Sequence, residues 1–139
     1  MLGGMKVADD MSPVAHSDGD VVLHALVDAL LGAMGWGDIG EHFANNDPRW
    51  KDAPSILFVT TIFDKVRSAG YVVQNVDVTI LAERPRLKDF KRPMAERIAA
   101  LLEITPGQVN VKAGTNEGCD AIGRGEAIAA HAVVMLTKV

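Results

Sequence analysis

The chain has 139 residues, of which 48% are apolar and 23% are charged, a composition typical of one globular domain spanning residues 1–139. Its net charge of −4 argues against a general nucleic-acid binder, and its single cysteine, Cys119, excludes an internal disulfide. No run approaches the roughly 20 apolar residues that a membrane span needs, and the first residues lack the order of a signal peptide. We therefore expect a soluble, cytoplasmic protein. Its mean hydropathy of +0.13 predicts that some surface is buried against other subunits.

The first part of the chain predicts a short edge strand over residues 1–7, followed by a helix. Residues 20–34 are apolar around nearly the whole helix circumference, so most of this helix should be buried. Ser17 followed by Asp20 indicates a capping box with Ser17 as the N-cap, and the helix should run to about Trp36 and end at Gly37.

Three polar side chains interrupt this apolar helix at Asp20, His24 and Asp28. Residues four apart share one helix face, so these side chains should form one polar line on a buried element. A lone histidine on an apolar face is more often a hydrogen-bonded core residue than a metal ligand. The flanking carboxylates favour the ligand role, with Asp28 orienting the His24 ring. His16 and Ser17 at the mouth of the same helix favour a bound phosphate, whereas Ser17 could equally be a simple cap.

The rest of the chain predicts a mixed sheet with helices packed on one face, an α+β two-layer fold. A second helix should begin at Asp52 or Ser55 and end at Gly70, and a third should span residues 88–103. Strands are expected at residues 71–82, 109–115 and 127–139. The last strand is apolar on both faces, so both faces should be buried.

Two glycine-containing segments suit phosphate chemistry, although each also has a plain structural interpretation. Residues 112–118 and 123–126 combine glycine, threonine, basic residues and a carboxylate, as a phosphate–Mg²⁺ site requires, but could also form an ordinary loop. Gly37 to Gly40 could simply end a helix. Six of the fourteen basic residues fall within residues 84–97, where a solvated helix face is the simpler explanation. His42 is expected in a surface loop and His131 in a buried strand, and Cys119 lacks an activating partner.

Six spaced motifs, taken together, closely resemble the 2-C-methyl-D-erythritol 2,4-cyclodiphosphate synthase family. In chain order they are Ala15-His16-Ser17-Asp18-Gly19-Asp20 with His24-Ala25-Leu26, Asp28-Ala29-Leu30-Leu31-Gly32, Gly37-Asp38-Ile39-Gly40, Asn75-Val76-Asp77-Val78-Thr79, Val109-Asn110-Val111-Lys112-Ala113 with Thr115-Asn116-Glu117, and Gly123-Arg124-Gly125-Glu126. The resemblance as a whole runs in order from about residue 2 to the C-terminus.

The resemblance implies an enzyme of the non-mevalonate isoprenoid route. In that family a phosphate on the methylerythritol of a CDP-linked substrate attacks the diphosphate phosphorus nearer the sugar alcohol, which closes a cyclic diphosphate and releases CMP. The resemblance further implies a homotrimer with active sites between neighbouring subunits, a tetrahedral zinc-type ion, and Mg²⁺ or Mn²⁺ near the diphosphate. It also implies the bacterial cytoplasm, or a plastid if a transit peptide has been removed. Nucleic-acid or membrane partners are not expected.

The resemblance assigns roles to residues of this chain by position. It implies catalytic roles for His16 and Thr115, a zinc-type ligand at His24 and a magnesium ligand at Glu117. The expected substrate-binding residues are His16, Ser17, Asp38, Ile39, Gly40, Phe43, Asp47, Ala82, Pro85, Arg86, Leu87, Lys88, Ala113, Gly114, Thr115, Asn116, Glu117 and Arg124. Among them, the resemblance places the turn at Asp38 and Gly40, with the loop of residues 43–47 beside it, at the methylerythritol. It places residues 82–88, with Ala113 and Gly114, at the cytidine.

The sequence departs from the family pattern in three places. Residues 43–47 lack the usual Phe-Pro pair, and residues 117–121 lack the usual Lys-Leu-Gly-Phe pattern. The family also begins with a strand that carries Asp-x-His and so supplies two ligands of the tetrahedral metal. This sequence contains only the third ligand, His24. Because the substrate-side residues are kept, we expect that strand to precede Met1 in the intact protein. The alternatives are an impaired trimeric homologue that only binds a cytidine nucleotide or a diphosphate, and a metallohydrolase that uses zinc-bound water.

Overall fold

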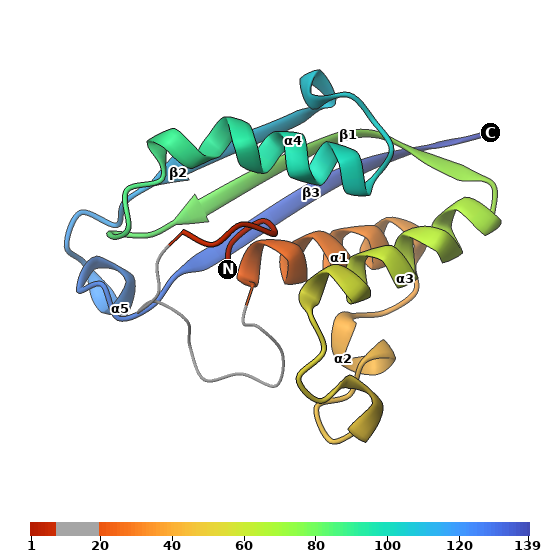
Figure 1. Cartoon of the computed structure of the whole chain (residues 1–139), viewed down its shortest axis with the longest axis horizontal. Coiled ribbons are helices and arrows are strands. Elements are labelled where there is room, and N and C mark those ends of the chain that lie inside the picture. The colour runs from red at the N-terminus through yellow and green to blue at the C-terminus, as the bar shows by residue number, and fades with distance from the viewer. Residues whose placement is uncertain (8–19) are drawn as a thin grey trace.

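The computed structural model describes residues 1–7 and 20–139 and shows a helical layer over one face of a mixed sheet (Figure 1). The three strands lie in the order β2-β1-β3, with β1 parallel to β2 and antiparallel to β3. Helix α4 packs on β2, α1 packs on β3, and α3 packs mainly on α1. The α+β class and the mixed sheet predicted from the sequence are confirmed.

The elements fall close to their predicted positions. The strands are β1 (Tyr71–Leu81), β2 (Val109–Gly114) and β3 (Ala129–Lys138). The helices are α1 (Val21–Met34), α2 (Ile39–His42), α3 (Ser55–Ser68), α4 (Lys91–Leu101) and α5 (Asp120–Gly123), with short 3₁₀ helices at Pro48–Trp50, Lys88–Phe90 and Pro106–Gln108. The predicted third helix is therefore a 3₁₀ turn followed by α4. None of these helices is long and apolar enough to cross a membrane.

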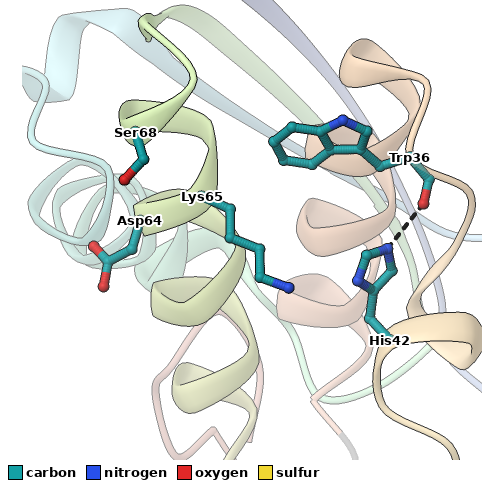
Figure 2. A pocket seen from close by; sticks show the side chains of 5 residues that line it. All are labelled: Trp36, His42, Asp64, Lys65 and Ser68. Carbon is teal, nitrogen blue, oxygen red and sulfur yellow. Dashed lines mark hydrogen bonds between the residues drawn. The ribbon is translucent and has the colours of Figure 1, made fainter.

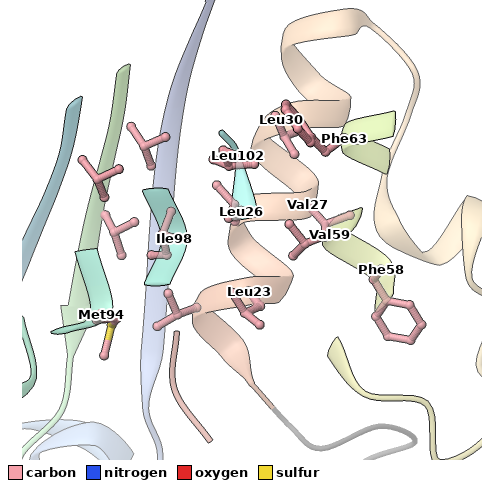
Figure 3. Packing of buried hydrophobic residues seen from close by; sticks show 14 of the residues in the cluster. Leu23, Leu26, Val27, Leu30, Phe58, Val59, Phe63, Met94, Ile98 and Leu102 are labelled. Carbon is pink, nitrogen blue, oxygen red and sulfur yellow. The ribbon is translucent and has the colours of Figure 1, made fainter. Parts of the chain in front are cut away.

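Helix α1 forms the centre of the core. Its buried side chains are Val22, Leu23, Leu26, Val27, Leu30 and Leu31. Figure 3 shows several of them in one cluster with Val59 and Phe63 of α3 and with Met94 and Ile98 of α4. Full burial of each such side chain contributes about 1.5–3 kcal/mol relative to exposure. This cluster therefore fixes the place of the α1 N-terminus, where His24 lies.

The caps of α1 differ from those predicted. Asp20, not Ser17, is the N-cap, since its carboxylate accepts a hydrogen bond from the Leu23 N–H at 3.0 Å. The helix ends at Met34, before Trp36, because Gly35 adopts a left-handed conformation with φ 69° and closes the last turn. His16 and Ser17 lie outside the described residues.

The N-terminal residues form a turn and not the predicted edge strand. Leu2 and Met5 make only an isolated bridge, and the N–H groups of Gly3 and Gly4 donate to the Asp20 carboxylate at 2.9 and 2.8 Å. Asp20 is fully buried, so these charge-assisted bonds compensate for its lost hydration. The carboxylate that the sequence placed on a polar line is thus the anchor of residues 1–7.

The two faces of the sheet have different surroundings. On the inner face Val76, Val78 and Ile80 are fully buried beneath the helices. On the outer face Val133 and Met135 are 69% and 62% exposed, and His131 is exposed beside them. The prediction that both faces of the last strand are buried, with His131 in the core, is therefore wrong for the single chain, because its own helices cover only one face.

Candidate active site

A cavity of about 370 Å³ opens where β1 and β2 end. The two strands are parallel, so their carboxyl ends meet at one edge of the sheet, and the Ala82 N–H donates to the Gly114 carbonyl at 3.0 Å. The cavity is lined by Ala82, Glu83, Pro85, Arg86, Leu87, Lys88, Lys91, Ala113, Gly114 and Thr115. Open α/β sheets commonly bind ligands just outside the carboxyl ends of their strands. The structure thus brings together two segments that are far apart in the sequence.

The cavity combines apolar and cationic groups. Ala82 and Leu87 are buried, at 7% and 5% exposure, and form an apolar base. Arg86, Lys88 and Lys91 surround it, and within the described residues none of the three forms an ion pair. Uncompensated positive charge in a concave site attracts anions, and guanidinium and ammonium groups both bind phosphate. The cavity therefore suits an apolar ring that carries phosphate groups.

The loop after β2 carries Thr115, which lines this cavity, and Glu117, which is not among the lining residues. The Thr115 hydroxyl accepts a weak hydrogen bond from the Glu117 N–H at 3.3 Å, so its own proton remains available for a ligand oxygen. Glu117 is an exposed residue with a φ of 51°. The predicted magnesium ligand thus lies two residues from the threonine that lines the cavity.

Helix α5 is tied to this loop by Asp120. Its carboxylate accepts hydrogen bonds from the Asn116 side chain at 2.8 Å and from the Ile122 N–H at 2.9 Å. The bond from Asn116, followed by the backbone bonds and nearby Arg124, lowers the pKa of Asp120 below its usual range. Arg124 forms an ion pair with Glu126 at 3.2 Å, and it does not line the cavity.

His24 lies at a different place, near the start of α1. Its Nε2 is 2.9 Å from the Ser55 hydroxyl of α3, and its ring centroid is 5.9 Å from that of Phe58. Asp28 does not serve as its support: its carboxylate accepts from the Ile39 N–H at 2.8 Å and so holds α2 against α1. The prediction that Asp28 orients His24 is wrong, because a nearby unpaired backbone N–H is the partner that Asp28 takes.

The predicted sugar-side residues gather around α2. Asp38 caps this helix by accepting from the Glu41 N–H at 3.0 Å, and Ile39 and Gly40 form its first turn. Phe43 is 6% exposed and packs on Trp50 and Phe58, with ring centroids 4.8 and 4.5 Å away. Any ligand contact by Phe43 would therefore use its backbone.

Asp47 follows α2 in the chain. Its carboxylate accepts hydrogen bonds from the backbone N–H and the guanidinium of Arg49. The hydrogen bond and charge of this carboxylate raise the pKa of Arg49. Figure 1 places α2 beside the ends of α1 and α3, away from the carboxyl ends of β1 and β2. Within one chain, the predicted sugar-side and nucleotide-side residues are therefore not brought together.

The donor set for a tetrahedral metal is incomplete in the part of the chain that the structure describes. No group of three or more histidine, cysteine or carboxylate side chains is gathered in residues 1–7 and 20–139. Catalytic zinc sites usually have three protein ligands. His24 alone does not meet this requirement.

A second cavity, of about 610 Å³, lies between the ends of α1 and α3 and helix α2. Figure 2 shows the Lys65 side chain extending from α3 toward His42, whose Nε2 is 2.8 Å from the Trp36 carbonyl oxygen. None of the predicted site residues lines this cavity. His42 is half-buried in α2, so its prediction as a surface-loop residue is wrong.

Two residues at the first cavity are not singled out by the sequence. Lys91 belongs to the basic run that a solvated helix face explains equally well. Glu83 stands between Ala82 and Pro85 but has no predicted role of its own. Only its proximity to residues 116–118, more than thirty positions later, shows what it contacts.

These features define a class: a layered protein of helices on a mixed sheet, with a basic cavity at the ends of its parallel strands. The chain belongs to the YgbB family, whose model matches residues 1–137. The family resemblance inferred from the motifs is thereby confirmed.

The relatives agree with this assignment. The 2-C-methyl-D-erythritol 2,4-cyclodiphosphate synthase of Moorella thermoacetica is 51% identical, over 98% of this chain and 83% of that protein. The synthase of Anaplasma phagocytophilum is 49% identical, over 98% of this chain and 81% of that protein.

Solved structures show the same fold. The bifunctional IspDF from Campylobacter jejuni superposes with a TM-score of 0.95 at 42% identity, covering all of this chain and 38% of that one. A CDP-bound 2C-methyl-D-erythritol-2,4-cyclodiphosphate synthase superposes with a TM-score of 0.90 at 31% identity, covering 99% of this chain and 89% of the other.

Proposed function

We propose that this chain is a subunit of a 2-C-methyl-D-erythritol 2,4-cyclodiphosphate synthase, a lyase of the non-mevalonate isoprenoid route. It converts 4-diphosphocytidyl-2-C-methyl-D-erythritol 2-phosphate to the cyclic diphosphate and releases CMP. The observation that carries this proposal is the basic cavity at the ends of β1 and β2, which has the residues that the family resemblance assigns to the cytidine. The CDP-bound structural relative supports such a ligand.

The reaction requires little covalent chemistry from the protein. An oxygen of the 2-phosphate attacks the diphosphate phosphorus nearer the sugar alcohol, a new P–O bond forms, and the bond from that phosphorus to the bridging oxygen breaks, so CMP leaves with that oxygen. Catalysis then consists of holding two anions in line and neutralising the charge that develops. In this chain the Thr115 hydroxyl would donate to the diphosphate, and the cations of the cavity would balance its charge. His16 and Ser17 are proposed for the attacking phosphate.

We propose that Mg²⁺ is held by Glu117. Mg²⁺ is commonly bound by one or two carboxylates together with substrate phosphates and water, so a single exposed carboxylate beside the cavity fits this chemistry. The ion would neutralise charge on the diphosphate. For the tetrahedral ion, the described residues gather no group of three or more possible ligands.

The proposed functional unit is a homotrimer with active sites between subunits. The exposed apolar side chains Val72, Val133 and Met135 on the outer sheet face support a covered interface there. The separation of α2 from the cavity within one chain supports a site that takes its sugar side from one subunit and its nucleotide side from the next (Figure 1).

The direct test is incubation with the CDP-linked 2-phosphate and Mg²⁺, with CMP measured by chromatography and the second product by phosphorus NMR. We expect stoichiometric CMP and a cyclic diphosphate. Linear phosphate products would indicate a metallohydrolase. CDP binding with no CMP from a chain that carries the family's Asp-x-His strand would indicate the impaired binding homologue.

The two proposed metal roles can be separated by substitution. His24→Ala should lower the content of tetrahedral metal, measured by plasma mass spectrometry, and leave the subunit assembly unchanged. Glu117→Gln should raise the Mg²⁺ concentration needed for activity and leave that metal content unchanged. Equal loss of tetrahedral metal in both variants would contradict this division.

A further inference from the structure

The loop that presents Glu117 is held by a carboxylate from the other side of the cavity. Oε1 of Glu83 accepts hydrogen bonds from the Asn116 N–H at 3.0 Å and the Gly118 N–H at 3.2 Å. Glu83 lies two residues after the end of β1, whereas the loop follows β2, so these two bonds join the two segments that line the cavity. Backbone N–H groups bonded to a carboxylate form charge-assisted hydrogen bonds, which are stronger than neutral ones.

The conformation at Glu117 is one that needs such support. Glu117 has a φ of 51° and Gly118 a φ of 77°, so two successive residues are in the left-handed region. A residue with a side chain adopts this region at an energetic cost and persists there only when its surroundings hold it. The Glu83 bonds restrain the residues on both sides of Glu117, and Thr115 accepts the N–H of Glu117 itself.

Helix α5 restrains the same turn by direct backbone packing. A Cβ at Gly123 would clash with the backbone of Gly118, which shows how closely the two backbones approach. Asp120, at the start of α5, also accepts a hydrogen bond from the Asn116 side chain. Within this arrangement the Glu83 carboxylate restrains the turn from the segment that follows β1.

We propose that Glu83 is a positioning residue, which fixes the Asn116-Glu117-Gly118 turn so that the Glu117 carboxylate and the Thr115 hydroxyl face the diphosphate. The catalytic consequence of this inference rests on the proposed function, whereas the hydrogen bonds of Glu83 to the turn are independent of that function. Glu83 acts through the turn and not by touching the reacting atoms. Two backbone N–H groups already donate to its Oε1, so this oxygen holds the turn.

The test compares Glu83→Ala with Glu83→Gln, and uses Glu96→Ala as the matched control. Glutamine keeps an oxygen that can accept the same two N–H groups, whereas alanine removes it. Glu96 is an exposed carboxylate on α4 that pairs with Arg92 and lies outside the cavity lining. Circular dichroism and thermal unfolding verify that each variant is folded.

The first measurement is amide hydrogen exchange of residues 116 and 118 by NMR, which requires no turnover. These amides should exchange at least about tenfold faster in Glu83→Ala and remain protected in Glu83→Gln and Glu96→Ala, since loss of the acceptor oxygen weakens local closure by about that factor. Unchanged protection in Glu83→Ala would overturn the proposal, whatever the chain catalyses.

The second measurement is Mg²⁺ activation of CMP release. In Glu83→Ala the Mg²⁺ concentration for half activation should rise about tenfold, whereas in the control Glu96→Ala it should be unchanged. Glu83→Gln should restore most of the activation. A Glu83→Ala variant with normal Mg²⁺ dependence would overturn the positioning role and leave the proposed function intact, whereas a wild-type chain without CMP release would contradict the proposed function alone.

Discussion

The inner and outer faces of the sheet are made by alternate residues of the same strands, yet they have opposite environments. Val78 and Ile80 on the inner face are fully buried under helices of the same chain, whereas Val133 and Met135 on the outer face are more than half exposed. Strand alternation assigns each residue to a face but does not say what covers that face. An apolar outer face that the chain itself leaves open indicates a surface that another subunit can cover.

The outer face is itself divided between apolar and polar groups. Its apolar residues lie toward the edge strand β3, where Val133 is the register partner of Asp77. Its polar residues lie toward β2, where Lys112 pairs with Asp77 at 2.8 Å and Asn110 donates to the same carboxylate at 3.1 Å. The contrast between the two faces is therefore strongest at β3.

The largest effect should come from the inner face. Ile80→Ala removes a fully buried side chain and should lower the free energy of unfolding by about 2–5 kcal/mol, because it leaves a cavity under the helices. Thr79→Ala is the matched control, as its neighbour on the opposite face, and should change stability by less than about 1 kcal/mol. Urea unfolding followed by circular dichroism measures both. Equal losses would show that the two faces are not energetically different.

A smaller effect on the fold, but a large one on assembly, is expected from the outer face. Val133→Asp places a charge on the exposed apolar surface and should convert the proposed trimer to monomers, since burial of an unpaired carboxylate at an interface is costly. Light scattering coupled to gel filtration gives the mass. Secondary structure should be unchanged, and Val133→Ala should remain trimeric. A Val133→Asp trimer would place the subunit interface elsewhere.

The smallest effect concerns the polar part of the outer face. The Lys112 and Asn110 hydrogen bonds lower the pKa of Asp77, so this pair contributes stability above the ordinary aspartate pKa of about 3.9 and loses it as the pH falls below that value. Lys112→Ala should therefore raise the Asp77 pKa toward its ordinary value and reduce the loss of stability in acid. NMR titration of the Asp77 carboxyl carbon gives a midpoint pH that reports this pKa. An unchanged midpoint in Lys112→Ala would show that Lys112 is not the cause.

Much of the fold is predictable because its signals are local. The burial of Val76, Val78 and Ile80 follows from strand alternation, and α3 begins at Ser55, one of the two predicted starts. The errors come from partners distant in sequence. Helical spacing assigns Asp28 to His24, four residues away, but Asp28 bonds to the Ile39 N–H, because no local rule identifies the backbone groups that a folded chain brings to a carboxylate.

The candidate site divides in the same way. The motifs alone identify the family and name most residues of the cavity, from Ala82 to Thr115. They do not show that Glu83 contacts residues 116 and 118, nor that α2 stands apart from that cavity (Figure 1). Both facts depend on how parallel strands align their ends and on how helices pack, which are properties of the assembled sheet.

Periodicity and motif spacing are local properties of the sequence. They therefore suffice to determine the family, the mixed sheet with its helical layer, and the residue types available for phosphate chemistry. Which of those residues meet depends on tertiary packing. Packing places Asp20 on the N-terminal turn, joins Glu83 to the loop of Glu117, and leaves the outer face of β3 uncovered. The physical reason is that buried polar groups take whichever partners the packed core brings within hydrogen-bonding distance.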